Sequence, residues 1–93
     1  MLDELFNIIE ERKTTKPEGS YTAQLMAMGE NRILRKIGEE VLEVIFASKD
    51  EGQQRLIEES ADIIYHLFVL LSYKGIKLEQ LKNELSLRHR SEQ

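Results

Sequence analysis

The chain has 93 residues, a formal net charge of −4 and no cysteine. A chain of this length forms one domain, expected over residues 1–93, and is too short for a barrel enzyme or a two-domain dinucleotide-binding protein. Its 17 acidic against 13 basic residues leave no positive surplus for binding nucleic acid or an anionic membrane, so we expect neither partner. The lack of cysteine, the acidic start and the absence of an apolar run of ~20 residues favour a cytoplasmic protein.

Apolar residues at helical spacing predict helices through most of the chain. The first helix is expected over residues 2–13, and the turn-forming stretch 17–22 carries hydroxyls that can cap a short helix over 23–28, closed by Gly29. The remaining elements are a long helix over 30–49, a turn at 50–52, a second long helix over 53–73, and a last helix that contains Leu78, Leu81 and Leu85 and ends near 88–90. No run alternates with period two for long enough to predict a strand, so the expected fold class is all-α.

The two long helices should pack as an antiparallel hairpin with short helices flanking it, because the turn between them is short. The first long helix has a core-type face made of Ile33, Leu34, Ile37, Val41, Val44 and Ile45. However, Leu42 and Phe46 lie on its other side, and the second long helix is apolar nearly all round. One chain has too few elements to cover both helices, so we expect a homodimer in which hairpins pair into a helical bundle.

Acidic residues form a stripe along each long helix. Glu39, Glu40 and Glu43 share one side of the first helix, and Glu59 and Asp62 share one side of the second, where apolar neighbours indicate contact with protein rather than water. Only one lysine, Lys36, lies on the first stripe. Two interpretations are open: exposed glutamates paired with Lys36, Arg32 and Arg35, or carboxylates that share a cleft and need a divalent cation. All-oxygen ligands would favour magnesium or manganese over zinc.

Positive and hydroxyl-bearing residues suggest where an anion could bind. The loop from Lys16 to Thr22, which includes Ser20 and Tyr21, offers backbone N–H groups and a helix N-terminus, although it would equally form a capped turn with solvated lysines. Lys36 can bind a phosphate or pair with a glutamate. His66 can carry a proton or be a buried, hydrogen-bonded structural histidine. The C-terminal residues Arg88, His89 and Arg90 can reach a substrate across a dimer interface or remain solvated.

The pattern Glu39-Glu40-x-x-Glu43 followed by Glu59-x-x-Asp62 resembles the metal-binding signature of the all-α nucleotide pyrophosphatases, which include MazG-like and dimeric dUTPase-like enzymes. Within this group the chain most resembles the phosphoribosyl-ATP pyrophosphatase family. The residues that carry this closer resemblance are Pro17 to Thr22, Leu25, Gly29, Ile33, Lys36, Gly38 to Glu40, Ala61 to Leu67, and Arg88-His89. The resemblance therefore covers nearly the whole chain.

The resemblance implies a helical dimer that uses magnesium to hydrolyse phosphoribosyl-ATP to phosphoribosyl-AMP and pyrophosphate, the second step of histidine biosynthesis. By motif position it implies that Glu40, Glu43, Glu59 and Asp62 are metal ligands and that Glu39 is a further ligand or the base for water. The residues that we predict to bind the substrate are Lys16, Ser20, Tyr21, Thr22, Lys36 and His66. The expected reaction is attack of water on the α-phosphorus, with the cation on the polyphosphate.

Two other functions would fit the same residues. A house-cleaning pyrophosphatase acting on a free nucleoside triphosphate would have the same metal site, and a panel of substrates would distinguish it. A non-catalytic helical dimerisation module would use the acids only for solubility, and it predicts no binding in a magnesium titration.

Overall fold

A computed structural model of the chain describes residues 1–92, with side chains described as far as residue 89. The elements are α1 (Leu2–Thr15), α2 (Tyr21–Met28), α3 (Glu30–Phe46), the π-helical turn η1 (Ala47–Glu51), α4 (Gln53–Tyr73) and α5 (Leu78–Glu92). Residues 1–92 contain no strand, and the predicted all-α class is confirmed. Among these residues no helix is long and apolar enough to cross a membrane.

Local hydrogen bonds set the bounds of the first two helices. Helix α1 runs two residues beyond the predicted end, and it closes at Lys16, whose backbone is left-handed with φ 50° and whose N–H donates to the Arg12 carbonyl. Helix α2 begins at Tyr21, two residues earlier than predicted, because the Ser20 hydroxyl oxygen accepts a hydrogen bond from the Ala23 N–H at 3.1 Å. The predicted hydroxyl cap of this helix is confirmed.

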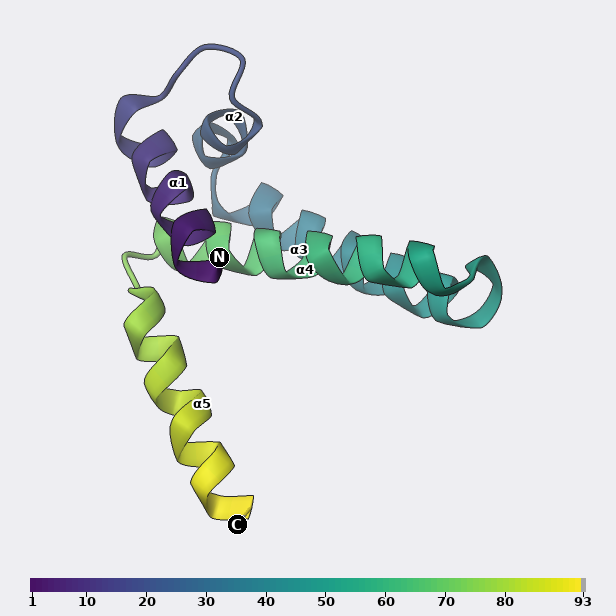
Figure 1. Cartoon of the computed structure of the whole chain (residues 1–93). Coiled ribbons are helices and arrows are strands. Elements are labelled where there is room, and N and C mark those ends of the chain that lie inside the picture. The colour runs from purple at the N-terminus through teal and green to yellow at the C-terminus, as the bar shows by residue number, and fades with distance from the viewer. Residues whose placement is uncertain (93) are drawn as a thin grey trace.

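Helices α3 and α4 lie side by side, and the chain reverses direction between them (Figure 1). Helix α3 ends earlier than predicted because its last turn widens into η1, which takes in part of the predicted turn. Gly52 then adopts φ 87°, a conformation open to glycine, and α4 starts at the next residue. The contact between α3 and α4 is the most extensive between two helices among residues 1–92.

The hydrophobic core lies where α1 and α2 meet the first part of α3 and the last part of α4 (Figure 1). The Phe6 and Phe68 rings meet edge to face there, with centroids 5.5 Å apart. The core residues are Phe6, Ile9, Leu25, Ile33, Phe68, Val69 and Leu78. Beyond this core, the second half of α3, η1 and the first half of α4 project as a two-helix arm, which carries the acidic residues.

Large apolar side chains remain exposed on α3 and α4, and we call this set of residues the outer apolar face. It consists of Leu34, Val41, Leu42, Ile45, Phe46, Ile57, Ile64 and Leu67, each 40–54% exposed. The prediction that Leu34, Val41 and Ile45 belong to the core is wrong for the single chain, because within the described residues 1–92 each of them stays 43–48% exposed. Helix α5 projects away from the body in another direction and leaves this face open (Figure 1).

Candidate metal centre

Three carboxylates meet between α3 and α4. Glu40 comes from α3, Glu59 and Asp62 come from α4, and one oxygen of each lies within 4.8 Å of the others. Glu59 is only 4% exposed and Glu40 9% exposed, whereas Asp62 is open to solvent. The helical spacing that puts Glu59 and Asp62 on one side of α4 therefore brings both toward Glu40. The prediction that this side of α4 faces protein is confirmed for Glu59 and is wrong for Asp62 in the single chain, where its side chain is exposed to solvent.

Two basic side chains pair with the buried glutamates. The Lys36 amino group lies 3.6 Å from a carboxylate oxygen of Glu39 and 3.6 Å from one of Glu40. Arg55 pairs with Glu59 at 2.5 Å from the preceding turn of α4. Among residues 1–89 no ion pair joins Arg32 or Arg35 to these glutamates. Sequence analysis missed Arg55, although its i, i+4 spacing to Glu59 is a signal for such a pair.

The electrostatics of this site favour a bound cation. Burial raises the pKa of the Glu59 carboxyl, the neighbouring Glu40 carboxyl raises it further, and Arg55 offsets this only in part. Burial alone would lower the pKa of Lys36, but Tyr21, Glu40 and Glu39 together raise it above its usual value. Carboxylates crowded in this way, with only oxygen atoms as donors, fit a divalent cation such as magnesium.

The other two predicted acids lie on α3 beside this cluster. Glu39 is exposed, and its carboxylate is held by Lys36. Glu43 is half-buried one turn further along α3 and is not among the carboxylates that meet within 4.8 Å. The structure thus brings together three of the four predicted metal ligands.

Polar and aromatic side chains join the start of α2 to α4 next to the acids. The buried His66 places Nδ1 2.7 Å from the Asp62 carbonyl oxygen and Nε2 3.1 Å from the Tyr21 hydroxyl. A carbonyl oxygen only accepts, so Nδ1 carries the hydrogen, and in the neutral ring the Tyr21 hydroxyl donates to Nε2. Thr22 and Tyr65 share a hydrogen bond between their hydroxyls. His66 therefore offers no free ring nitrogen here and instead fixes the Tyr21 phenol.

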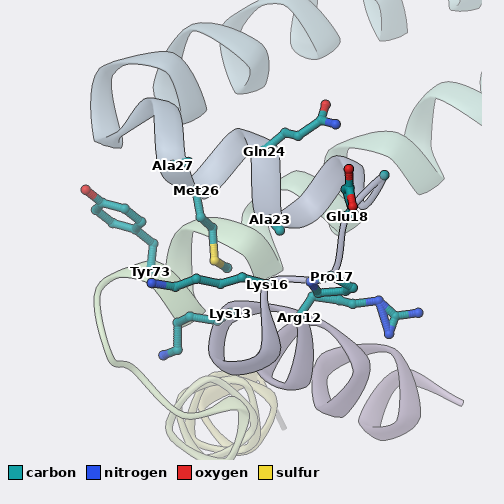
Figure 2. A pocket seen from close by; sticks show the side chains of 11 residues that line it. Arg12, Lys13, Lys16, Pro17, Glu18, Ala23, Gln24, Met26, Ala27 and Tyr73 are labelled. Atoms are coloured by element: carbon teal, nitrogen blue, oxygen red, sulfur yellow. The ribbon is translucent and has the colours of Figure 1, made fainter.

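The remaining predicted substrate-binding residues lie elsewhere. The Ser20 hydroxyl oxygen is engaged as the cap of α2. Lys16 lines a separate pocket between α1 and α2, and none of the five acids contributes to it (Figure 2). At the C-terminus, Arg88 pairs with Glu84 at 3.2 Å, while the Arg90 side chain lies outside the described residues.

The fold and the site define an all-helical protein with an oxygen-lined candidate cation site between two neighbouring helices. The sequence profile of the family Phosphoribosyl-ATP pyrophosphohydrolase matches residues 2–89. A protein of Clostridium acetobutylicum named Phosphoribosyl-ATP pyrophosphatase is 52% identical over 89 residues, which is 96% of this chain and 81% of that protein. Proteins of the same name from Metallosphaera sedula and Haloarcula marismortui are 49% and 51% identical. These alignments span 95% of this chain in each case, and 95% and 92% of the relatives. The chain belongs to the phosphoribosyl-ATP pyrophosphohydrolase family.

Proposed function

We propose that this protein hydrolyses phosphoribosyl-ATP to phosphoribosyl-AMP and pyrophosphate, the second step of histidine biosynthesis, as a cytoplasmic, magnesium-dependent homodimer. The family match over residues 2–89 carries the proposal. The meeting of Glu40, Glu59 and Asp62 within 4.8 Å supports it, because a polyphosphate substrate needs a cation between itself and these acids.

Glu40, Glu59 and Asp62 would hold the magnesium ion, and Glu43, one turn further along α3, would complete the ligand set. When bound, the ion would neutralise part of the polyphosphate charge and lower the pKa of a water molecule bound to it. Glu39 is the acid best placed to accept a proton, because it is exposed beside the cluster and outside it.

Lys36 and Tyr21 would bind the substrate phosphates at the edge of the acidic cluster. Lys36 has its amino group within ion-pair distance of Glu40, so an anion bound there would lie close to the carboxylates. His66 holds the Tyr21 hydroxyl, and Thr22 fixes Tyr65 behind it. Substrate contact by Lys16 and Ser20 stays a prediction.

Hydrolysis in oxygen-18 water tests the reaction. Attack on the α-phosphorus places the label in phosphoribosyl-AMP and none in pyrophosphate, because the new bond forms on the nucleotide side. Oxygen-18 in pyrophosphate would contradict attack on the α-phosphorus, although the protein would still be a pyrophosphatase. Single phosphate as the first product would contradict the pyrophosphatase function itself.

A panel of substrates separates the proposal from a house-cleaning enzyme. With magnesium present, phosphoribosyl-ATP should be hydrolysed with a much larger kcat/KM than ATP or other free nucleoside triphosphates. Equal values for ATP would favour the house-cleaning function. A calorimetric titration that detects no magnesium binding would favour a dimerisation module without catalysis.

The homodimer is supported by the outer apolar face, which one chain leaves uncovered. We propose that hairpins formed by α3 and α4 of two chains pair through this face into a helical bundle. Burying it would remove apolar side chains of both helices from water.

A further inference from the structure

A cavity of about 550 Å³ lies between α1, the loop after it, α2 and the end of α4. Its volume is in the range of small-molecule sites, roughly 300–1,000 Å³. The lining residues are Arg12, Lys13, Lys16, Pro17, Glu18, Gly19, Ala23, Gln24, Met26, Ala27 and Tyr73. At 100° per residue, Ala23 and Ala27 lie about 200° and 240° around α2 from Tyr21, so the cavity opens on the side of α2 away from the acidic cluster.

Of the cations that line this cavity, Lys16 is the one without a partner among the described side chains. Arg12 pairs with Glu11 at 3.3 Å. Lys13 pairs with Glu10 at 3.2 Å and donates to the Ser72 carbonyl at 2.8 Å. Among residues 1–89, Lys16 makes no ion pair or side-chain hydrogen bond. Figure 2 shows its side chain running across the pocket in the direction of Tyr73.

The backbone of Lys16 is unusual for a residue that carries a side chain. It is the one non-glycine residue with positive φ among the described residues, and it directly precedes Pro17. A left-handed backbone is unfavourable for a side chain with a Cβ, and glycine would end α1 with less strain. Strain of this kind is kept where the surrounding structure or a ligand uses the side chain.

The rest of the lining combines apolar side chains with two exposed polar ones, Glu18 and Gln24. Tyr73 offers a ring, Met26 an adaptable thioether and Pro17 a further apolar surface, while Ala23 and Ala27 leave room beside them. A ligand that suits this lining has a flat, apolar ring system and a single strongly charged group. It would place the ring against Tyr73 and Met26 and the charge at Lys16.

We propose that this cavity is a second binding site, separate from the acidic cluster, for a nucleoside monophosphate. Its phosphate pairs with the amino group of Lys16. Its base packs on Tyr73 and Met26. The site shares no residue with the carboxylates and needs no cation. It uses Lys16, so it would replace the predicted contact of Lys16 with phosphoribosyl-ATP and leave the rest of the proposed function unchanged.

Calorimetry on the whole chain with AMP, in the presence of EDTA, tests the site directly. Lys16→Gly should weaken AMP binding at least about tenfold, because it removes a charge-assisted contact. The variant should melt no earlier than wild type, since glycine suits φ 50°. Lys49→Met removes an exposed lysine from η1, outside the cavity, and should leave AMP binding unchanged. Equal AMP affinity in the Lys16→Gly protein, or no binding up to about 10 mM AMP, would overturn the proposal.

Ligand fragments test the two halves of the recognition. Adenosine, which lacks the phosphate, and ribose 5-phosphate, which lacks the base, should each bind at least about tenfold more weakly than AMP. Ribose 5-phosphate binding as tightly as AMP would mean that only an anion is recognised. Adenosine binding as tightly would mean that Lys16 is not used. Either result would overturn a nucleotide site.

A further experiment distinguishes a site for a free nucleotide from a site that binds part of the phosphoribosyl-ATP substrate. Ala27→Trp fills the cavity from an exposed position on α2 and should abolish AMP binding in EDTA. It should leave the KM for phosphoribosyl-ATP within about twofold of wild type. A tenfold rise in KM would assign the cavity to the substrate and overturn a separate site. Glu59→Gln should leave AMP binding unchanged. A loss of AMP binding in this variant would also overturn the proposal of a separate site.

Discussion

Two buried glutamates give the site its chemical character. Glu40 and Glu59 lie against each other, and each is paired with one basic side chain, Lys36 or Arg55. Both basic residues reach their glutamates from the preceding turn of the same helix, so neither pair ties α3 to α4. A divalent cation bound by both glutamates would make that connection. We therefore expect magnesium to stiffen the two-helix arm as well as to bind substrate.

Removing a single carboxylate should abolish most of the activity. Glu40→Gln, Glu59→Gln and Asp62→Asn should each lower kcat/KM by at least about 100-fold at moderate magnesium, because each removes a charge from the cation site and no packing. Steady-state kinetics and far-UV circular dichroism measure activity and fold. Glu79→Gln is the matched control, an exposed glutamate on α5 outside the carboxylate cluster. Near wild-type turnover at saturating magnesium in any of the three would remove that residue from the ligand set.

The buried Ser72 hydroxyl should be dispensable for stability. Its side chain is fully buried, and its oxygen has no hydrogen-bond partner among the residues whose side chains are described, whereas its backbone carbonyl accepts from Lys13. Ser72→Ala removes an unsatisfied polar atom and improves helix propensity, so it should raise the free energy of unfolding by about 0.5–2 kcal/mol.

Urea denaturation measures this effect. Ser60→Ala is the matched control on α4, because it gains the same helix propensity but loses a hydrogen bond of 2.7 Å to the Leu56 carbonyl. It should stabilise the protein less than Ser72→Ala does. A Ser72→Ala protein that unfolds more easily than wild type would mean that a buried water bonds the hydroxyl.

At the scale of single residues, the sequence alone predicts some of the burial of the site residues but not their contacts. Counting along the helices predicted correctly that Glu59 faces protein, because its neighbours on α4 are apolar. It could not show that Lys16 and the acids lie on different sides of α2, since this depends on how α1 and α2 pack. The same holds for His66, whose pairing with Tyr21 joins residues 45 positions apart.

At the scale of elements, helix positions were predictable but the buried side of α4 was not. The bounds of α4 agree with the prediction. The sequence shows α4 as apolar nearly all round, and the single chain buries the side with Glu59, His66, Val69 and Ser72 while Ile57, Ile64 and Leu67 stay exposed. Apolar residues surround this helix almost completely, so periodicity gives no unique inward direction. The π-helical turn η1 also has no signal in local propensity.

Helix α5 is tied to α1 by a titratable pair. The Lys82 amino group donates to an Asp3 carboxylate oxygen at 2.5 Å, and this hydrogen bond holds the pKa of Asp3 below its usual value of 3.8. The folded protein therefore binds the Asp3 proton more weakly than the unfolded chain does. The stabilisation is complete above pH 3.8 and disappears as the pH falls through the lowered pKa of Asp3.

Removing Lys82 should reverse this shift. In the Lys82→Met protein the pKa of Asp3, followed by NMR titration of its side-chain carboxyl, should rise back toward 3.8. Lys77→Met is the control, since Lys77 lies just before α5 and makes no ion pair with Asp3. An Asp3 pKa that is the same in wild type and Lys82→Met would show that α5 is not held by this contact.

At the scale of the whole molecule, the single chain is more extended than its length requires. Its radius of gyration is 14.7 Å, whereas a compact chain of this length is expected near about 12 Å. The difference comes from the two-helix arm and from α5, which leave the core in different directions (Figure 1). The outer apolar face lies along this arm and exposes large side chains such as Leu42 and Phe46. A surface of this kind is typical of an interface.

Replacing one residue of that face with a charged residue should separate the dimer. Wild type should sediment at micromolar concentration with twice the 10.9 kDa mass of the chain. Leu42→Glu should sediment as a monomer, because a charge buried at a two-fold interface occurs in both copies and meets no partner. Leu2→Glu is the matched control, a similarly exposed leucine on α1 outside the outer apolar face. Glu40, Glu59 and Asp62 come from one chain, so the monomeric variant should still bind magnesium in calorimetry. A wild-type mass near 10.9 kDa, or a Leu42→Glu protein that sediments like wild type, would contradict pairing through this face.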